Sequence, residues 1–404
     1  MRTSRIAATL LTAGALLATA ACGTNDNSTS SPTSAAPSPS GASSAASTAA
    51  SGAASTAASG AVSTAASGAV SSAPAAGSSA PACGTGSLSA QGSTFQQNME
   101  TQWSKDFATQ CTGAQINYQG TGSGAGITAI GNGTADFAGS DVTTTAAQQT
   151  AANTACASTA ITIPVTVGGV AIVYNLSSVP KLQLSATDLA GIFSGKITKW
   201  NDAALAADNP GVTLPSTPIS VFYRNDSSGT TQVYTAFLQA DAGSAWTLGS
   251  SKTLTFFGGA TGKPKSAGVA AAVGQTTGGI TYDEESYAKG QNLPTALVKG
   301  TGTTFVAPTT DQVSQSIADG FAVTGTGNDL AGSLAFTKMT GYPISTVSYA
   351  IACTKYKDAA KGALVKSYLY YAVSKGQAAA DGLGFAALPS SLVSKDQASI
   401  SAIS

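Results

Sequence analysis

Short Val- and Ile-rich runs alternate with helical patterns from about residue 83 to residue 404, and this alternation predicts an α/β fold. Apolar side chains recur every fourth residue between positions 95 and 107, as on the buried face of a helix. This helix is expected to open at Ser93 and Thr94, whose hydroxyl groups are interpreted as a cap. A strand, a glycine-rich turn, a short helix around Ile127 and Ile130, and a second strand are predicted next, at residues 115–119, 120–126, 127–130 and 135–139.

Two continuous apolar runs, residues 161–174 and 346–352, are predicted to be strands that cross between two lobes. A self-sufficient α/β segment lies between them, and a long helix at 359–373 then returns to the first lobe. A chain that leaves one lobe, builds another and comes back gives two lobes around a hinged cleft. The predicted fold is therefore the two-lobed periplasmic-binding-protein fold (type II), in which each lobe is a mixed sheet flanked by helices. The expected limits are 83–170 with 342–404 for lobe I and 171–341 for lobe II.

The first residues have the pattern of an export signal. Arg2 and Arg5 supply positive charge, and residues 6–18 form an apolar run too short for a convincing transmembrane helix. Residues 19–23 (TAACG) resemble a bacterial lipoprotein cleavage box, which predicts a signal peptide at 1–21 and a lipidated Cys22. Thr19 departs from the usual leucine, and plain secretion with Cys22 inside the discarded peptide is the alternative.

A low-complexity segment follows at residues 22–82. It consists mostly of Ser, Ala, Thr, Gly and Pro, and an eight-residue unit at 47–54 recurs from Ser55 and from Ser63. Such a segment has almost nothing to bury in a core, so it is predicted to be a flexible tether. Its expected role is to hold the folded part away from a membrane or through a cell wall.

The amino-acid composition argues against several classes of partner and of catalytic or metal site. The net charge is zero and only 9% of residues are charged, which argues against nucleic acid or an acidic membrane surface as a partner. Histidine is absent, which removes His-based catalytic triads and the commonest metal ligand. Cys83, Cys111, Cys156 and Cys353 are an even number in an exported chain and none lie at C-x-x-C spacing, so two disulfides are favoured over a metal site.

Three stretches place Ser, Thr and Gly at a predicted helix start: residues 93–95, 122–124 and 228–230. The first amide groups of a helix have no acceptor within the helix, and the helix dipole is positive there, so an anion is favoured. Arg224 adds a planar fork of donors that suits an oxyanion, and Asp226 is placed to orient it. One such stretch alone indicates a capped turn, but three together with Arg224 predict an oxyanion site built mainly from dipoles.

Four dispersed motifs now resemble a known family. They are residues 90–95 (AQGSTF), 117–124 (NYQGTGSG), 136–141 (DFAGSD) and 224–230 (RNDSSGT), with further matches at 192–202 and 279–282. In this order, from residue 88 to the end of the chain, they resemble the phosphate-binding lipoproteins of bacterial ABC phosphate transporters. The tether and the paired cysteines are most similar to the actinobacterial branch.

The resemblance implies a ligand, partners and residue roles. The expected phosphate contacts are Thr94, Phe95, Ser123, Asp141, Arg224, Ser228, Gly229 and Thr230, with Asp226 orienting Arg224. Ser227 stands where many relatives have glycine, and no loss of function is expected from it. The fold favours the pairs Cys83–Cys111 and Cys156–Cys353 over the other two connectivities. A monomer is expected, held on the extracytoplasmic face of the cell membrane by its lipid (palmitate) anchor alone, with ABC permease subunits as partners and without cofactor or metal.

The hydrogen-bonding chemistry of a carboxylate gives a separate argument for the role of Asp141. An ionised carboxylate only accepts hydrogen bonds, so it repels a fully deprotonated anion. Phosphate near neutral pH still has a proton to donate, whereas sulfate does not. The sequence thus predicts that Asp141 selects phosphate over sulfate, although without the other motifs it would be read as a structural cap at a strand end.

Three other functions stay open at this point. The first is a receptor for a different oxyanion or a phosphate ester, because the donors do not fix the ligand's substituents. The second is a secreted phosphatase-like enzyme with Ser228 as nucleophile, but no histidine, no Ser-x-x-Lys arrangement and no dense carboxylate cluster supports it. The acidic run 283–285 is interpreted as a solvated turn or helix start. The third is a purely surface-exposed interaction protein, which the tether permits.

Overall fold

The centre of the fold is one mixed sheet of eight strands in the order β2-β1-β3-β12-β4-β8-β6-β7. A computed structural model describes residues 80–404; the predicted signal peptide, Cys22 and the tether up to residue 79 lie outside the described residues. The strands of this sheet are β1 (Gly86–Gly92), β2 (Ala114–Gly120), β3 (Phe137–Ser140), β4 (Ala160–Tyr174), β6 (Ser220–Arg224), β7 (Thr261–Lys263), β8 (Gly279–Glu284) and β12 (Ser345–Cys353). Two small sheets pair β5 (Gln183–Ser185) with β9 (Leu297–Lys299), and β10 (Phe321–Val323) with β11 (Gly332–Leu334).

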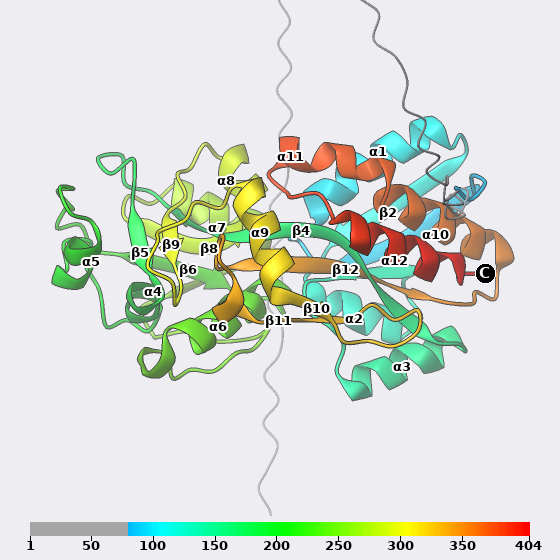
Figure 1. Ribbon diagram of the computed structural model, residues 1–404, viewed down its shortest axis with the longest axis horizontal. Coiled ribbons are helices and arrows are strands. Elements are labelled where there is room, and N and C mark those ends of the chain that lie inside the picture. Colours follow the sequence, from blue (N-terminus) through cyan, green and yellow to red (C-terminus); the bar gives the residue numbers. More distant parts are fainter. Residues whose placement is uncertain (1–79) are drawn as a thin grey trace, which may run out of the picture. The chain divides into compact units, whose positions relative to one another are not determined.

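Helices cover both faces of the large sheet (Figure 1). At the β2 end, α1 and α10 lie on one face and α2 and α3 on the other; at the β7 end, α6 lies on one face and α7 with α8 on the other. The α-helices are α1 (Gln97–Gln110), α2 (Ser123–Gly131), α3 (Ala146–Cys156), α4 (Ala186–Phe193), α5 (Ala203–Asp208), α6 (Gly229–Asp241), α7 (Lys265–Gly274), α8 (Glu285–Gly290), α9 (Thr310–Gly320), α10 (Ala359–Ala372), α11 (Ala380–Leu383) and α12 (Ser390–Ser401). Short 3₁₀ turns are η1 (Gly243–Ala245), η2 (Phe336–Lys338) and η3 (Lys375–Ala379). Within residues 80–404, none of these helices combines the length and the hydrophobicity of a membrane span.

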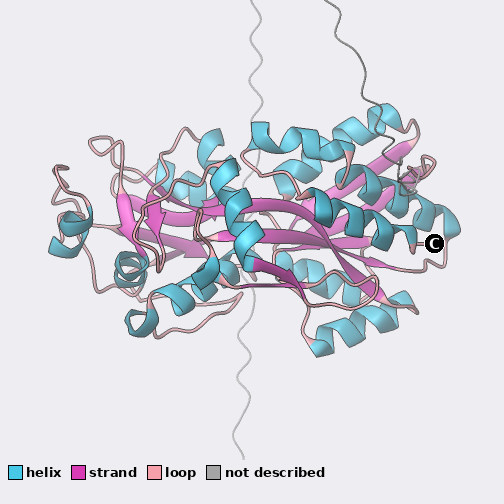
Figure 2. Ribbon diagram, in the orientation of Figure 1, coloured by secondary structure: helices cyan, strands magenta, loops and turns pink. Residues whose placement is uncertain are grey.

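The two apolar runs form the long central strands β4 and β12, as Figure 2 shows. Residues 160–169 of β4 pair antiparallel with β12, and residues 170–174 of the same strand pair with β8. Strand β4 therefore passes from one part of the sheet to the other. Every residue of both strands is buried, which explains why they are apolar without the alternation of a half-exposed strand. The fold is the predicted α/β class, while the lobe limits 83–170 with 342–404 and 171–341 remain predictions.

One predicted helix start is wrong. Helix α1 begins at Gln97, and its N-cap Gln96 makes no capping bond with its side chain. Ser93 and Thr94 instead lie in the loop after β1, where the Ser93 hydroxyl accepts a hydrogen bond from the Phe95 amide at 3.0 Å. A local bond from a hydroxyl to the backbone competes with helix formation, which delays the start of α1. Phe95 still belongs to the core, where its ring packs edge-on against Phe385.

Both predicted disulfides are present. Cys83 pairs with Cys111 across α1, and Cys156 pairs with Cys353, joining the end of α3 to the end of β12. The second bond links residues 197 positions apart in the sequence. It therefore removes a large amount of conformational freedom from the unfolded chain.

A buried carboxyl on α1 should make stability depend on pH. Burial raises the pKa of Glu100 to about 7, against hydrogen bonds from Tyr368 and Gln96 at 2.6 and 3.2 Å. Because the folded state holds this proton more tightly than the unfolded state, its stabilising contribution is complete below about pH 4.5 and is lost as the pH rises to about 7. We expect Glu100→Gln to reduce the loss of unfolding free energy between pH 5 and pH 8 by about 3 kcal/mol, measured by urea denaturation.

The control for this prediction is Asp106→Asn, which removes a half-buried carboxyl from the same helix. Asp106 accepts a hydrogen bond from Gln102 on the surface of α1. An equal pH dependence in wild type and Glu100→Gln would contradict the prediction.

Candidate functional site

The predicted site residues lie where strands of the large sheet end. Strands β1, β2 and β3 are parallel neighbours, and their carboxyl ends lead to Thr94, Ser123 and Asp141. Strands β6 and β7 are also parallel, and they lead to α6 and α7. In open α/β sheets, ligands bind at such carboxyl ends, where loops and helix N-termini gather.

Asp141 lies inside a cage of hydroxyl groups. Its Oδ1 accepts hydrogen bonds from Ser93 and, at 2.7 Å, from Ser348. Its Oδ2 accepts longer bonds from Ser123 at 3.2 Å and from Thr230 at 3.3 Å. Burial raises the pKa of Asp141, while the hydroxyls of Ser93, Ser348 and Ser123 and the positive charge of Arg224 act in the opposite direction. The carboxylate is therefore buried but hydrogen-bonded, the condition under which a buried charge is tolerated.

Arg224 is fully buried at the end of β6 and forms a bidentate ion pair with Asp226. The Nε–Oδ1 distance is 2.7 Å, so the Asp226 carboxylate contacts the guanidinium in its own plane. The remaining amino group, Nη1, donates to the Ser266 hydroxyl at 3.1 Å. The ion pair outweighs burial and lowers the pKa of Asp226. A fixed, buried guanidinium of this kind is suited to an oxyanion.

The two predicted halves of the site meet directly. The Thr94 and Ser266 hydroxyls are 2.9 Å apart, and Thr230 donates to Asp141. Gly229 approaches so closely that a Cβ on it would lie 2.7 Å from Asp141 Oδ2 and would also overlap Ser123 Oγ. The structure thus brings Thr94, Ser123, Asp141, Arg224, Gly229 and Thr230 together, although they come from distant parts of the chain.

The start of α6 is the helix N-terminus that the sequence predicts. Ser228 is its N-cap, and its hydroxyl accepts from the Thr231 amide at 3.1 Å. For the amides of Gly229 and Thr230, at the first two helical positions, the helix itself offers no acceptor. The Ser228 hydroxyl is thus engaged in capping, whereas the amides of Gly229 and Thr230 are the natural anion donors of this turn. Phe95 differs, because its amide already donates within its own loop.

The structure adds three residues to the candidate site that the sequence analysis did not name as contacts. Ser266 lies in the first turn of α7 and contacts both Thr94 and Arg224. Its signal was available, because a serine two residues after the Pro264 N-cap places a hydroxyl group in the first turn of α7. Ser93, which the sequence analysis interpreted only as a cap, and Ser348, which lies in no motif, likewise donate to Asp141.

The interpretation of the acidic run as solvated is wrong. Asp283 and Glu284 are fully buried at the end of β8, and Glu284 caps α8 by accepting from the Ser286 amide at 2.8 Å. The helix start was expected correctly, but the burial was not. The reason is tertiary, because β8 is covered on both faces and its last residues pair with β4.

Ser227, the position that departs from many relatives, lies against the start of α2. Its backbone oxygen accepts from the Gly124 amide at 3.0 Å, and its hydroxyl occupies the space that a Cβ on Gly124 would need. The serine is therefore accommodated because residue 124 is a glycine.

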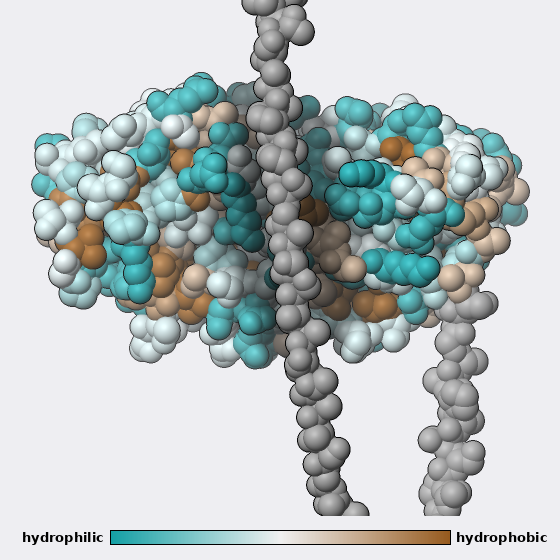
Figure 3. Space-filling view, turned by 90° about the horizontal axis from the view of Figure 1, so that it is seen from above, coloured by the Kyte–Doolittle hydropathy of each residue, from teal (hydrophilic) through white to brown (hydrophobic). Residues whose placement is uncertain are grey.

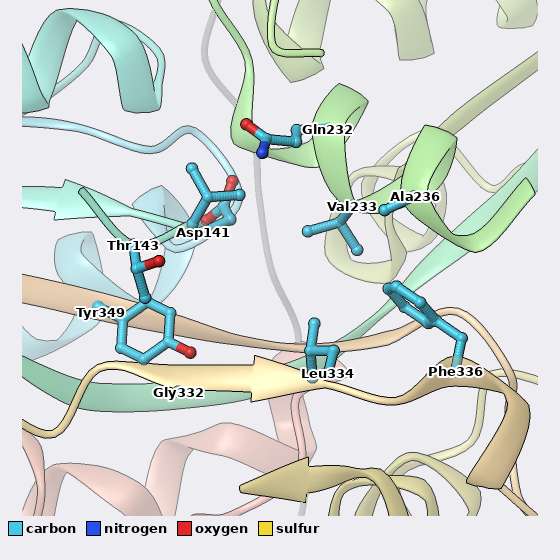
Figure 4. Close-up of a pocket in the computed structure, with 10 residues that line it drawn as sticks. Asp141, Thr143, Gln232, Val233, Ala236, Gly332, Leu334, Phe336 and Tyr349 are labelled. Atoms are coloured by element: carbon cyan, nitrogen blue, oxygen red, sulfur yellow. The ribbon is translucent and has the colours of Figure 1, made fainter. Parts of the chain in front are cut away.

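A groove of about 190 Å³ adjoins the site (Figure 4). Asp141 and Thr143 line it from the β3 side, and Gln232, Val233 and Ala236 line it from α6, while Leu334 and Phe336 form another wall. Hydrophilic and hydrophobic residues are interspersed over the face of the molecule in Figure 3.

Comparisons with known proteins agree with this architecture. The model of the PBP superfamily domain matches residues 45–375. The chain is 40% identical over 326 residues to phosphate-binding protein PstS 3 of Mycobacterium tuberculosis (strain ATCC 25618 / H37Rv), covering 79% of this chain and 87% of the relative. It is 34% identical over 323 residues to phosphate-binding protein PstS of Xylella fastidiosa (strain 9a5c), covering 77% and 84%.

A solved structure of similar fold is a high-affinity periplasmic phosphate-binding protein (PfluDING) bound with phosphate. It is 25% identical, has a TM-score of 0.63, and is matched over 78% of this chain and 93% of its own. The relatives found by sequence and by structure are binding proteins of one kind. The chain belongs to the PBP superfamily and, within it, to the family of PstS phosphate-binding proteins.

Proposed function

We propose that this protein is an extracytoplasmic receptor that binds inorganic phosphate between two lobes and delivers it to an ABC importer. The observation that carries the proposal is the convergence of Arg224, Thr94, Ser123 and the start of α6 on the hydroxyl-caged Asp141. Membership of the PstS family supports phosphate as the ligand.

The proposed binding step is an exchange of hydrogen bonds. An anion entering between Arg224 and the α6 N-terminus replaces the direct contacts Thr94–Ser266 and Thr230–Asp141 with contacts of its own. The hydroxyls that turn toward the anion are those with the longest bonds to Asp141, Ser123 and Thr230. Asp141 then accepts a hydrogen bond from the hydroxyl group that phosphate retains near neutral pH.

Asp141→Asn tests the selectivity. We expect the variant to bind sulfate at least tenfold more tightly than wild type, because the amide can donate to a fully deprotonated oxyanion where the carboxylate repels it. Titration calorimetry with phosphate and with sulfate measures both affinities. Asp136→Asn is the control, since Asp136 forms a surface ion pair with Lys361 at 2.7 Å. Sulfate rejection that is unchanged in Asp141→Asn would rule out this role.

The proposal also includes how the protein is attached to the membrane and which partners it meets there. Cys22 carries the lipid (palmitate) anchor, the tether spans from the membrane to the folded part, and a monomer presents both lobes to the permease subunits. These assignments are supported by the lipoprotein-like residues 19–23 and by the low-complexity segment.

The receptor is proposed to have no catalytic activity. Ser228, the candidate nucleophile, is fully buried and accepts from the Thr231 amide as the cap of α6. A thermal-shift assay with phosphate beside a turnover assay with an aryl phosphate separates the two functions. We expect stabilisation by phosphate without turnover; turnover would favour a phosphatase-like enzyme, and stabilisation by an ester instead of phosphate would favour an ester receptor.

A further inference from the structure

Asp283 is a buried carboxyl group with an unsatisfied oxygen. It lies on β8, its exposed fraction is 0%, and its Oδ1 accepts from the Glu284 amide at 2.9 Å. Its Oδ2 has no hydrogen-bond partner among the residues that the structure describes. Buried polar atoms without a partner are rare in native proteins, and each one calls for an explanation.

The surroundings of Asp283 connect it to the proposed phosphate site. Burial raises the pKa of its carboxyl to about 7, against the positive charge of Arg224 and the hydroxyl of Ser266. Ser266 in turn contacts Arg224 and Thr94. Ser266 therefore lies between Asp283 and the contact that joins the two halves of the candidate site. The other ionisable groups that act on or near it are Asp226 beside Arg224, Glu284 on the same strand, and Tyr287 on α8.

Asp283 and Asp141 differ in how they are hydrogen-bonded. Asp141 accepts from four hydroxyl groups, which favours its charged form. Asp283 has one backbone donor, on Oδ1, and no partner within hydrogen-bond distance on Oδ2 among the described residues, so its negative charge is stabilised mainly by Arg224 and less strongly by the nearby Ser266 hydroxyl. When an anion takes up the charge of Arg224, Asp283 loses that compensation in a region of low dielectric.

We propose that Asp283 is a further residue of the binding site, which takes up one proton on Oδ2 from solvent when phosphate binds beside Arg224 and Ser266. The inference rests on the proposed function. The proton moves from solvent to the carboxylate on binding and returns to solvent when the anion leaves, so charge and atoms balance. Through this linkage, phosphate binding weakens by up to about tenfold per pH unit above pH 7, beyond the pH dependence of phosphate itself.

The test is calorimetric titration of the full-length protein with inorganic phosphate, in pairs of buffers that differ in ionisation enthalpy, from pH 6 to pH 8.5. The buffer dependence of the heat gives the number of protons taken up. We expect wild type to take up more protons than Asp283→Asn, with the largest difference near pH 7, and the variant to show a flatter dependence of affinity on pH. Glu285→Gln is the matched control: burial raises the pKa of Glu285 to about 7 as well, but its charged neighbour is Lys289 instead of Arg224.

Each outcome decides the matter. Proton uptake and pH dependence that are equal in wild type and Asp283→Asn overturn the inference while leaving phosphate binding intact. If Glu285→Gln and Asp283→Asn lose the same amount of proton uptake, the inference is also overturned, because the loss is then a general effect of removing a buried carboxyl group. If Asp283→Asn does not fold, Asp283→Val takes its place. If wild type takes up no protons on binding beyond those that the phosphate ion itself exchanges, that result alone overturns the inference. Wild type that does not bind phosphate at all overturns the proposed function.

Discussion

Replacing Arg224 with alanine is expected to weaken phosphate binding by at least a hundredfold at low and moderate salt. The guanidinium is fully buried, is held by Asp226 through two hydrogen bonds, and is the only arginine in the described part of the chain. Its removal takes away charge-assisted bonds to the anion and also leaves the Asp226 carboxylate unpaired next to the site. A hydrogen bond to a charged group typically contributes about 1.5–3 kcal/mol, so the loss of the guanidinium exceeds the effect of losing any one neutral donor here. Calorimetric titration with phosphate measures the loss.

Two further variants separate charge from geometry. Arg224→Lys keeps the positive charge but loses the planar fork, so intermediate binding is expected. The double variant Arg224→Ala with Asp226→Asn removes the unpaired carboxylate and should recover stability without recovering affinity. Binding by Arg224→Ala within a few-fold of wild type would mean that the helix-start donors alone hold the anion.

Gly229→Ala is expected to weaken phosphate binding about 10- to 100-fold without removing any polar group. A Cβ at this position would lie 2.7 Å from Asp141 Oδ2 and would overlap Ser123 Oγ, so the start of α6 must retreat from the other half of the site. Overpacking of this kind costs about 1–3 kcal/mol. Here it destabilises the arrangement in which the start of α6 contacts Asp141 and Ser123. The affinity is measured by titration, and the unfolding temperature should change much less.

Gly258→Ala is the matched control for this prediction. A Cβ on Gly258 meets no heavy atom within 4 Å, and its backbone is not in the left-handed region. It should bind phosphate as wild type does. Equal affinities for Gly229→Ala and wild type would show that close approach of the two halves is not needed for binding.

Much of the fold was predictable because its signals are local or strongly periodic. The runs that form β4 and β12 are mostly apolar, without the alternation of a half-exposed strand, and the helix start at Ser228 follows directly from Ser, Gly and Thr after the β6 strand. The candidate site residues Thr94, Ser123, Asp141 and Arg224 were proposed from motifs, and they lie close together in the structure.

The rest depends on tertiary contacts that no local pattern encodes. Ser266 is an ordinary helix-start serine until β7 places α7 beside Arg224. Asp283 belongs to an acidic run that has the composition of a surface turn, yet its strand is covered on both faces. The start of α1 was misplaced because the Ser93 hydroxyl, which was expected to cap the helix, bonds to Asp141 and to its own loop.

A crystal structure of the protein grown with phosphate tests the central claim most directly. The account predicts one tetrahedral anion within hydrogen-bond distance of Thr94, Ser123, Arg224, the amides of Gly229 and Thr230, and Asp141 Oδ2, with Asp226 still holding the guanidinium. An anion bound elsewhere, or phosphate crystals in which Thr94 still contacts Ser266 and Thr230 still donates to Asp141, would contradict it.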